Sequence, residues 1–230
     1  MTEKSINEAQ LVAAYCLISE LFLYPEDRDE MRIDAEMERL HDAPAGLRAP
    51  LQEFLAAPAA ANTGEYVSTL ELAPLAPLYI GAYLYDEPTS CRGAGMSGRN
   101  GYMVELSNIY RHFGVELDSG ELADFVPIIV EFLAISLERQ DEDRIGLRRY
   151  FVEGSLINGV EALLSKLRKV ESPYAHLVES LRVALTADIA QMAGGPKWQP
   201  QPEDKSRRPS ATTCGVSVND FTGAEKGAEL

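Results

Sequence analysis

The sequence has few side chains of the kinds that bind metals or form disulfides. Its 230 residues include three cysteines, three histidines and a single tryptophan. The cysteines, Cys16, Cys91 and Cys214, are an odd number and lie far apart, so they indicate neither a disulfide framework nor a metal-ligand spacing. We therefore expect no disulfide-stabilised domain, no metal site and no bound cofactor.

Positive charge is also scarce. The chain has 21 lysines and arginines against 36 aspartates and glutamates, a formal net charge of −15. From residue 193 to the end, five bases balance five acids, so the excess (16 bases against 31 acids) lies on residues 1–192. An acidic body disfavours nucleic acid and anionic membranes. It suits a basic partner, although acidic surfaces more often serve only solubility.

Long hydrophobic runs are missing. A membrane-spanning helix needs about 20 apolar residues, and no run in this sequence is that long. The N-terminal residues, MTEKSINEAQ, contain no apolar segment of the signal-peptide type. We therefore expect a cytoplasmic protein whose cysteines stay reduced.

The most apolar stretch, residues 117–139, predicts the central helix of an all-helical fold. Its apolar residues fall on nearly every face, as in a helix surrounded by others. Pro127 suits the first helical turn, and Glu131 is expected to reach solvent or an arginine. Short polar side chains that could cap this helix precede it: Asp118, Ser119, Glu121 and Asp124.

Apolar residues at helical spacing predict further helices on both sides. Ser5–Glu8 resembles a capping box for the first of them. Residues 78–85, LYIGAYLY, are expected to be helical but could equally form a strand. The expected helices are residues 11–22, 27–40, 48–57, 64–72, 78–85, 102–113, 141–152, 158–167 and 173–192.

These helices predict an all-α fold, a single helical bundle domain over residues 1–193. Residues 194–230 are rich in proline, serine and glycine and have no apolar periodicity, so we expect a flexible tail.

One segment resembles a nucleotide-binding motif. Gly93–Gly98 matches GxGxxG, which makes a nucleotide-binding protein the alternative interpretation. Residues 86–92 separate the motif from the preceding apolar run, however, and Gly101 interrupts the place where a phosphate-facing helix would begin. No later βαβ unit is predicted. A flexible loop is the better interpretation.

Catalytic patterns are equally weak. Glu38–His41 is an ExxH sequence, but it occurs once, whereas a di-iron bundle needs two. No segment combines a nucleophile with a base and an oxyanion site. We expect no catalytic residues and infer that the protein binds rather than transforms its partner.

Five blocks between residues 66 and 134 follow the pattern of a known family: YVSTLEL (66–72), LYIGAY (78–83), TSCRG (89–93), YRHFGV (110–115) and ELADFVPIIVEFLA (121–134). In order and spacing they resemble the NarJ-type chaperones, the nitrate reductase delta subunits of the TorD/DmsD group. Ala123 and Phe125 stand where that family has proline and histidine, and the arginine block at 89–93 is thinned.

The resemblance implies an all-helical, non-enzymatic cytoplasmic chaperone. Such a protein binds the immature catalytic subunit of a DMSO-reductase-family molybdoenzyme until its molybdenum cofactor is in place. The enzyme could be nitrate reductase or a relative acting on selenate, chlorate, dimethyl sulfide or ethylbenzene. A structural subunit of the mature enzyme is a further alternative.

A helical client leader that is basic and amphipathic would fit an acidic, apolar groove. Rim carboxylates would steer it more than hold it; our candidates are Glu71, Glu121 and Asp124. The candidates for the groove wall are Tyr66, Leu70, Tyr110 and Phe125. For each residue the alternative is an ordinary structural role, with Asp124 capping the central helix and the aromatic side chains in the core.

Overall fold

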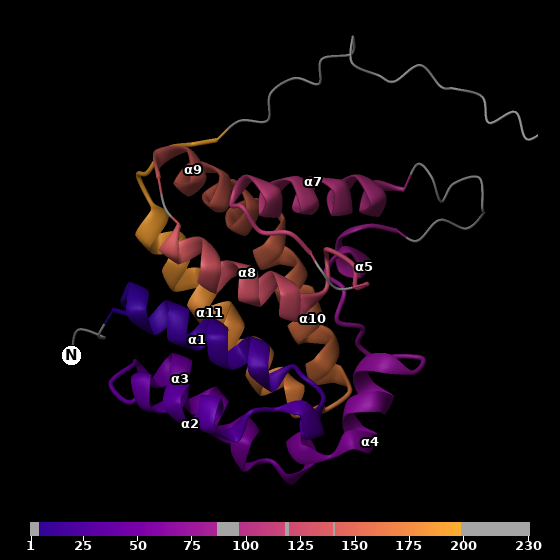
Figure 1. Ribbon diagram of the computed structural model, residues 1–230. Coiled ribbons are helices and arrows are strands. Elements are labelled where there is room, and N and C mark those ends of the chain that lie inside the picture. The colour runs from indigo at the N-terminus through magenta and orange to yellow at the C-terminus, as the bar shows by residue number, and fades with distance from the viewer. Residues whose placement is uncertain (1–4, 87–96, 118–119, 140, 199–230) are drawn as a thin grey trace, which may run out of the picture. The chain divides into compact units, whose positions relative to one another are not determined.

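The computed structural model describes residues 5–86, 97–117, 120–139 and 141–198 (Figure 1). They belong to one compact unit, Met1–Gln199. The predicted all-helical fold is confirmed. Within the described ranges the β pairing is limited to one isolated bridge. No helix in these ranges is both long and apolar enough to cross a bilayer.

The helices follow the chain in this order: α1 (Glu8–Leu21), α2 (Glu30–Arg39), α3 (Ala45–Ala56), α4 (Thr63–Tyr66) with a π-helical turn at Val67–Glu71, α5 (Gly81–Leu84), α7 (Gly98–His112), α8 (Val126–Glu138), α9 (Glu142–Phe151) with a π-helical turn at Val152–Leu156, α10 (Ile157–Lys169) and α11 (Tyr174–Met192). Two 3-10 turns, Pro25–Asp27 and Pro58–Ala61, connect the early helices.

The contacts of α1 and α11 organise the core. α1 lies beside α8 and also packs against α2 and α11 (Figure 1). α11 in turn packs against α3 and α10. α1 and α11, the first and last helices of the described residues, therefore lie side by side, and α8 packs against α1.

α8 is the apolar helix that the sequence predicts. Pro127 lies in its first turn, most of its side chains are buried, and Glu131 is exposed, as expected. The prediction that Asp124 caps it is wrong. Phe125 is the N-cap residue, and no side chain caps the helix. Asp118 and Ser119 lie outside the described residues.

The predicted capping box at Ser5–Glu8 is shifted by two residues. Asn7 is the N-cap of α1: its Oδ1 accepts from the backbone N–H of Gln10 at 2.9 Å, and Gln10 Oε1 accepts from the N–H of Asn7 at 3.1 Å. An asparagine caps as well as a serine, and a glutamine can return the bond.

Two other boundaries also differ. α9 and α10 are predicted as separate helices, but the π-helical turn joins them without a break, since no proline interrupts the segment. α7 begins at Gly98 rather than Tyr102, because the Ser97 hydroxyl accepts a bond from the N–H of Asn100. The Ser97 cap thus offsets the helix-weakening effect of Gly98 and Gly101.

Four helices meet at a buried polar network that the sequence analysis missed. The guanidinium of Arg148 (α9) binds both carboxylate oxygens of Asp188 (α11). Tyr15 (α1) donates to Asp188 at 2.7 Å, and Arg148 Nε donates to the hydroxyl of Ser136 (α8) at 2.8 Å. Burial and the Asp188 carboxylate both raise the pKa of Tyr15.

The network places a charged pair, Arg148 and Asp188, inside the core. The pKa of Arg148 is raised, since its bonds to Asp188 outweigh the opposing effect of burial. Asp188 falls in the apolar stripe of α11 that includes Leu181, Leu185 and Met192, which is the signal that could have revealed it.

The predicted domain boundary remains a prediction. Gly194–Trp198, the start of the expected tail, is described and follows α11, whereas residues 199–230 lie outside the described residues.

Candidate functional site

The segment before α8 pairs with the segment before α5. Tyr79 and Phe125 form an isolated antiparallel bridge. The N–H of Ile80 donates to the carbonyl of Asp124 at 2.9 Å, and the N–H of Val126 donates to that of Leu78 at 2.8 Å. The ambiguity of LYIGAYLY has a physical basis, because its first part pairs like a strand and its second part is α5.

Asp124 is the buried centre of this junction. Its carboxylate accepts from Arg99 Nε at 2.9 Å and from the N–H of Gly81 at 3.1 Å. A Cβ on Gly81 would lie 2.5 Å from Asp124 Oδ2, so this approach requires glycine. Asp124 therefore joins α5 and α7 to the start of α8, and its side chain has no exposed surface.

An aromatic and acidic surface lies over Asp124. The Tyr79 hydroxyl donates to Glu121 Oε1 at 3.0 Å, and the Tyr79 and Phe125 rings are 5.4 Å apart. The guanidinium of Arg99 lies 5.5 Å from the centre of the Tyr79 ring. Burial, followed by the Glu121 hydrogen bond, raises the pKa of Tyr79 to about 12. Leu122 beside them is 43% exposed.

We call Tyr79, Glu121, Leu122 and Phe125 the α8 patch. It combines partly buried aromatic rings, an exposed leucine and a carboxylate. That composition suits a partner with both an apolar face and a positive charge.

A second apolar surface follows the π-helical turn after α4. Leu72 is 73% exposed and Leu75 is 50% exposed, and the exposed carboxylate of Glu71 comes directly before them. We call Leu72–Leu75 the leucine loop. Pro74 and Pro77 keep this segment from continuing the helix.

The backbone of the leucine loop is strained. Ala73 has φ of 49°, a left-handed conformation that costs a residue with a Cβ about 1–2 kcal/mol. The loop thus exposes two leucines and holds an unfavourable backbone angle, neither of which stabilises the fold. Such a combination is typical of surfaces kept for binding.

The two surfaces are close enough for one ligand segment. Leu75 and Tyr79 are four residues apart, and four residues span at most about 14 Å. A peptide of moderate length can therefore contact the leucine loop and the α8 patch together.

Three of the predicted groove-wall residues are buried in the core. The Tyr66 hydroxyl donates to the carbonyl of Phe22 at 3.2 Å, and burial raises the pKa of Tyr66 to about 12. Leu70 follows Tyr66 in the π-helical turn. Tyr110 donates to the carbonyl of Ala123 at 2.8 Å.

The structure thus divides the predicted site residues into two groups. Glu121, Asp124 and Phe125 meet at the start of α8, with Tyr110 supporting the backbone there. Tyr66, Leu70 and Glu71 belong to the α4 segment.

Four residues of these surfaces were not predicted as site residues from the sequence: Leu72, Leu75, Tyr79 and Leu122. The signal for the first two is the pattern LAPLAP, in which each leucine is followed two residues later by a proline.

The other candidate motifs give no site within the described residues. No group of three or more histidine, cysteine or acidic side chains there could hold a metal ion. In the ExxH sequence, the His41 ring bonds the carbonyl of Glu38 at 2.9 Å. Gly93–Met96 of the GxGxxG match lies outside the described residues, and Gly98 begins α7.

Together these features define an all-helical protein with an exposed apolar and acidic surface supported by buried tyrosines. A family model described as nitrate reductase delta subunit matches residues 34–180, and the chain belongs to that family. A comparison with curated proteins gave no match. Membership supports, in general, a role in the assembly of a molybdoenzyme rather than in catalysis.

Proposed function

We propose that this protein is a cytoplasmic assembly chaperone for the catalytic subunit of a DMSO-reductase-family molybdoenzyme. It binds the immature subunit and holds it for insertion of the molybdenum cofactor. Nitrate reductase or a relative acting on another small substrate is the proposed client. The family match over residues 34–180 carries this proposal, because that range includes both the leucine loop and the α8 patch.

In this proposal the two surfaces hold one amphipathic, basic segment of the client, such as its N-terminal leader. Leu72 and Leu75 cover the apolar face of the segment. Glu71 and Glu121 steer its positive charges and set its register.

The buried residues have a supporting role in the same proposal. Asp124 and Tyr110 fix the backbone under the α8 patch, and Tyr66 and Leu70 fix the helical segment that leads into the leucine loop. A chaperone must also release its client. We therefore expect micromolar affinity, near −8 kcal/mol.

Calorimetric titration tests the proposal. The full chain is titrated with the immature catalytic subunit of a DMSO-reductase-family molybdoenzyme from the same organism, and with a peptide of the subunit's leader. We expect Leu72→Ser/Leu75→Ser to weaken binding at least tenfold, since two exposed apolar contacts are lost. The free energy of unfolding should change by less than about 0.5 kcal/mol for each exposed site.

Leu55→Ser is the matched control. Leu55 is 41% exposed but lies on α3, outside the proposed surfaces, so its substitution should leave binding unchanged. A chain that binds no segment of the immature subunit would contradict the proposal. Retention in the mature enzyme would instead identify a structural subunit, and a thermal shift with nucleotides alone would favour the nucleotide-binding alternative.

A further inference from the structure

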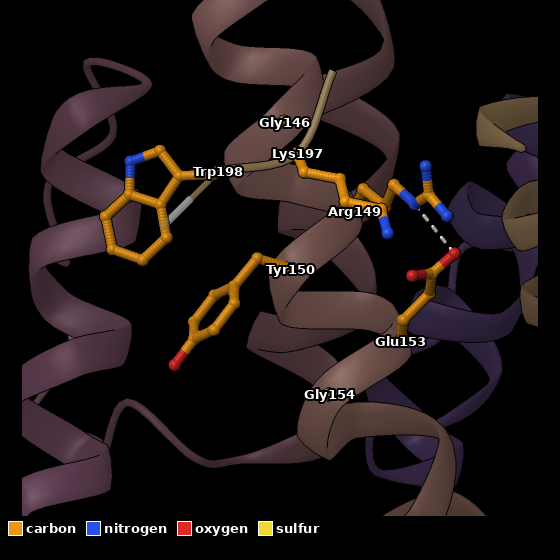
Figure 2. A pocket seen from close by; sticks show the side chains of 7 residues that line it. All are labelled: Gly146, Arg149, Tyr150, Glu153, Gly154, Lys197 and Trp198. Carbon is orange, nitrogen blue, oxygen red and sulfur yellow. Dashed lines mark hydrogen bonds and ion pairs between the residues drawn. The ribbon is translucent and has the colours of Figure 1, made fainter. Parts of the chain in front are cut away.

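The chain turns back on itself after α11. Gly194 has φ of 84°, and the N–H of Gly195 donates to the carbonyl of Met192 at 3.0 Å. We call Gly195–Trp198 the strap. Its residues Lys197 and Trp198 lie against α9 (Figure 2). Arg149 Nη1 donates to the carbonyl of Gly195 at 3.3 Å.

The strap lies in a groove along one face of α9 and its π-helical turn. The residues on this face recur at intervals of three and four: Gly146, Arg149, Tyr150, Glu153 and Gly154. With Lys197 and Trp198 they enclose a pocket of about 360 Å³. This volume falls within the range of known ligand sites.

Two glycines form the floor of the groove, and only one of them is covered. A Cβ on Gly146 would lie 3.1 Å from the backbone N of Trp198 and 3.5 Å from the carbonyl of Pro196. At Gly154, by contrast, an added Cβ would meet nothing within 4 Å. The strap therefore fills the Gly146 end and leaves room at the Gly154 end.

The contacts of the strap show what this groove recognises. The indole of Trp198 lies against the Tyr150 ring, with centroids 4.9 Å apart and planes tilted by 57° (Figure 2). Arg149, which also pairs with Glu153 at 2.9 Å, donates to the backbone carbonyl of Gly195. These are an aromatic contact and a backbone contact, the two features of an extended peptide ligand.

The strap is held weakly for the size of its groove. One hydrogen bond of 3.3 Å and one tilted ring pair are the described polar and aromatic contacts that hold it to α9. Lys197 is exposed, and it lines the same pocket as the partly exposed carboxylate of Glu153. The remaining charged residues of the lining, Arg149 and Glu153, pair with each other, so the groove selects its ligand through the aromatic and backbone contacts.

We propose that this groove is a second peptide-docking site, separate from the leucine loop and the α8 patch. The strap occupies the position of the ligand until an extended client segment with a tryptophan displaces it. The identity of the client rests on the proposed function, whereas the peptide specificity of the groove rests on the contacts of the strap.

A peptide supplied in trans tests the groove without a client. The full chain with Trp198→Ala contains no tryptophan, because Trp198 is its single one. The capped peptide GGPKWQ, the sequence of residues 194–199, then carries the only indole in the sample. We expect saturable binding, seen as a blue shift and increased anisotropy of the indole emission.

Three controls define the outcome. Adding Tyr150→Ala should weaken peptide binding at least tenfold, and adding Gly146→Leu should do the same by filling the floor of the groove. Circular dichroism verifies that each variant is folded. The chain with native Trp198 should bind the peptide at least tenfold more weakly by calorimetry, because its tethered strap competes at millimolar effective concentration.

Absence of saturable binding to the folded Trp198→Ala chain would overturn the inference. Equal binding of N-acetyltryptophanamide would also overturn it, since the groove would then be a site for small aromatic molecules.

A second measurement separates this inference from the proposed function. The chain is labelled with 5-fluorotryptophan, and the ¹⁹F signal of Trp198 is followed while the unlabelled immature subunit is added. A shift toward the signal of an exposed indole supports displacement of the strap. An unchanged signal with calorimetric binding overturns the inference and leaves the proposed function standing. Peptide binding without client binding supports the groove and contradicts the proposed function.

Discussion

At the scale of single residues, Asp124 matters most for the shape of the proposed binding surface. A buried carboxylate is tolerated only when it is paired and hydrogen-bonded. Asp124 meets this condition through Arg99 and the N–H of Gly81. Its carboxylate thus acts on the α8 patch from below, by fixing the backbone that presents Glu121 and Phe125.

Asp124→Ala should lower the free energy of unfolding by about 3 kcal/mol, because Arg99 is left without its partner in a mostly buried place. Urea denaturation monitored by circular dichroism measures the change. Glu121→Ala, a substitution on the surface of the same junction, should change stability by less than about 0.5 kcal/mol. Similar losses for both variants would show that Asp124 does not organise the junction.

Tyr66 gives the fold a pH dependence in the alkaline range. Its pKa is raised to about 12 by burial, against about 10 for an unfolded tyrosine. The folded chain therefore binds more protons than the unfolded chain between these values. The contribution of Tyr66 is fully present below pH 10 and is lost as pH rises toward 12, at up to about 1.4 kcal/mol per pH unit.

Tyr66→Phe should make the fall in unfolding free energy between pH 10 and pH 12 shallower. Urea unfolding at a series of pH values, compared between the two chains, gives the slope. Equal slopes would mean that the Tyr66 hydroxyl titrates in the folded chain as it does in the unfolded chain.

At the scale of helices, the Arg148–Asp188 pair decides how α9 and α11 meet. Asp188→Ala should destabilise the fold by about 3–5 kcal/mol, because it leaves a buried guanidinium without its counter-charge. The double substitution Arg148→Met/Asp188→Leu should cost less than the sum of Arg148→Met and Asp188→Leu. A double-mutant cycle in urea measures the coupling, and additive losses would contradict it.

The helices themselves were largely predictable. Apolar spacing places α8 and α11 close to their observed positions, because α8 buries most of its side chains and α11 buries one long face. α2 also lies within its predicted range, although none of its side chains is fully buried. The junction between α9 and α10 was missed, since a π-helical turn continues the helix where Glu153, Gly154 and Ser155 interrupt the apolar pattern.

Polar partners were not predictable in the same way. Asp124 looks like a helix cap in the sequence, and only the approach of Arg99 and Gly81 in space gives it another role. Leu72 and Leu75 were missed for a related reason: apolar residues are expected inside, and exposure depends on how the prolines direct the chain. Glu71 is at the surface, but whether it contacts a client remains a prediction.

At the scale of the whole molecule, the charge predicts how a client arrives. A net charge of −15 should speed the association of a basic segment, and added salt should slow it. We expect the association rate to fall steeply between 50 and 300 mM salt (about 14 to 6 Å of screening length) while the dissociation rate changes little. Stopped-flow fluorescence with a labelled leader peptide measures both rates.

Glu71→Gln/Glu121→Gln should lower the association rate and its salt dependence together, since both carboxylates lie on the proposed surfaces. Glu138→Gln removes an exposed charge at the far end of α8 and serves as the control. An association rate that is indifferent to salt would contradict electrostatic steering.

The central claim is that this protein holds a catalytic subunit only before its cofactor is in place. The most direct measurement is a pair of calorimetric titrations of the full chain, one with the cofactor-free catalytic subunit and one with the cofactor-loaded subunit. The account predicts micromolar binding to the first and at least tenfold weaker binding to the second. Equal affinity for both forms, or no affinity for the cofactor-free form, would contradict it.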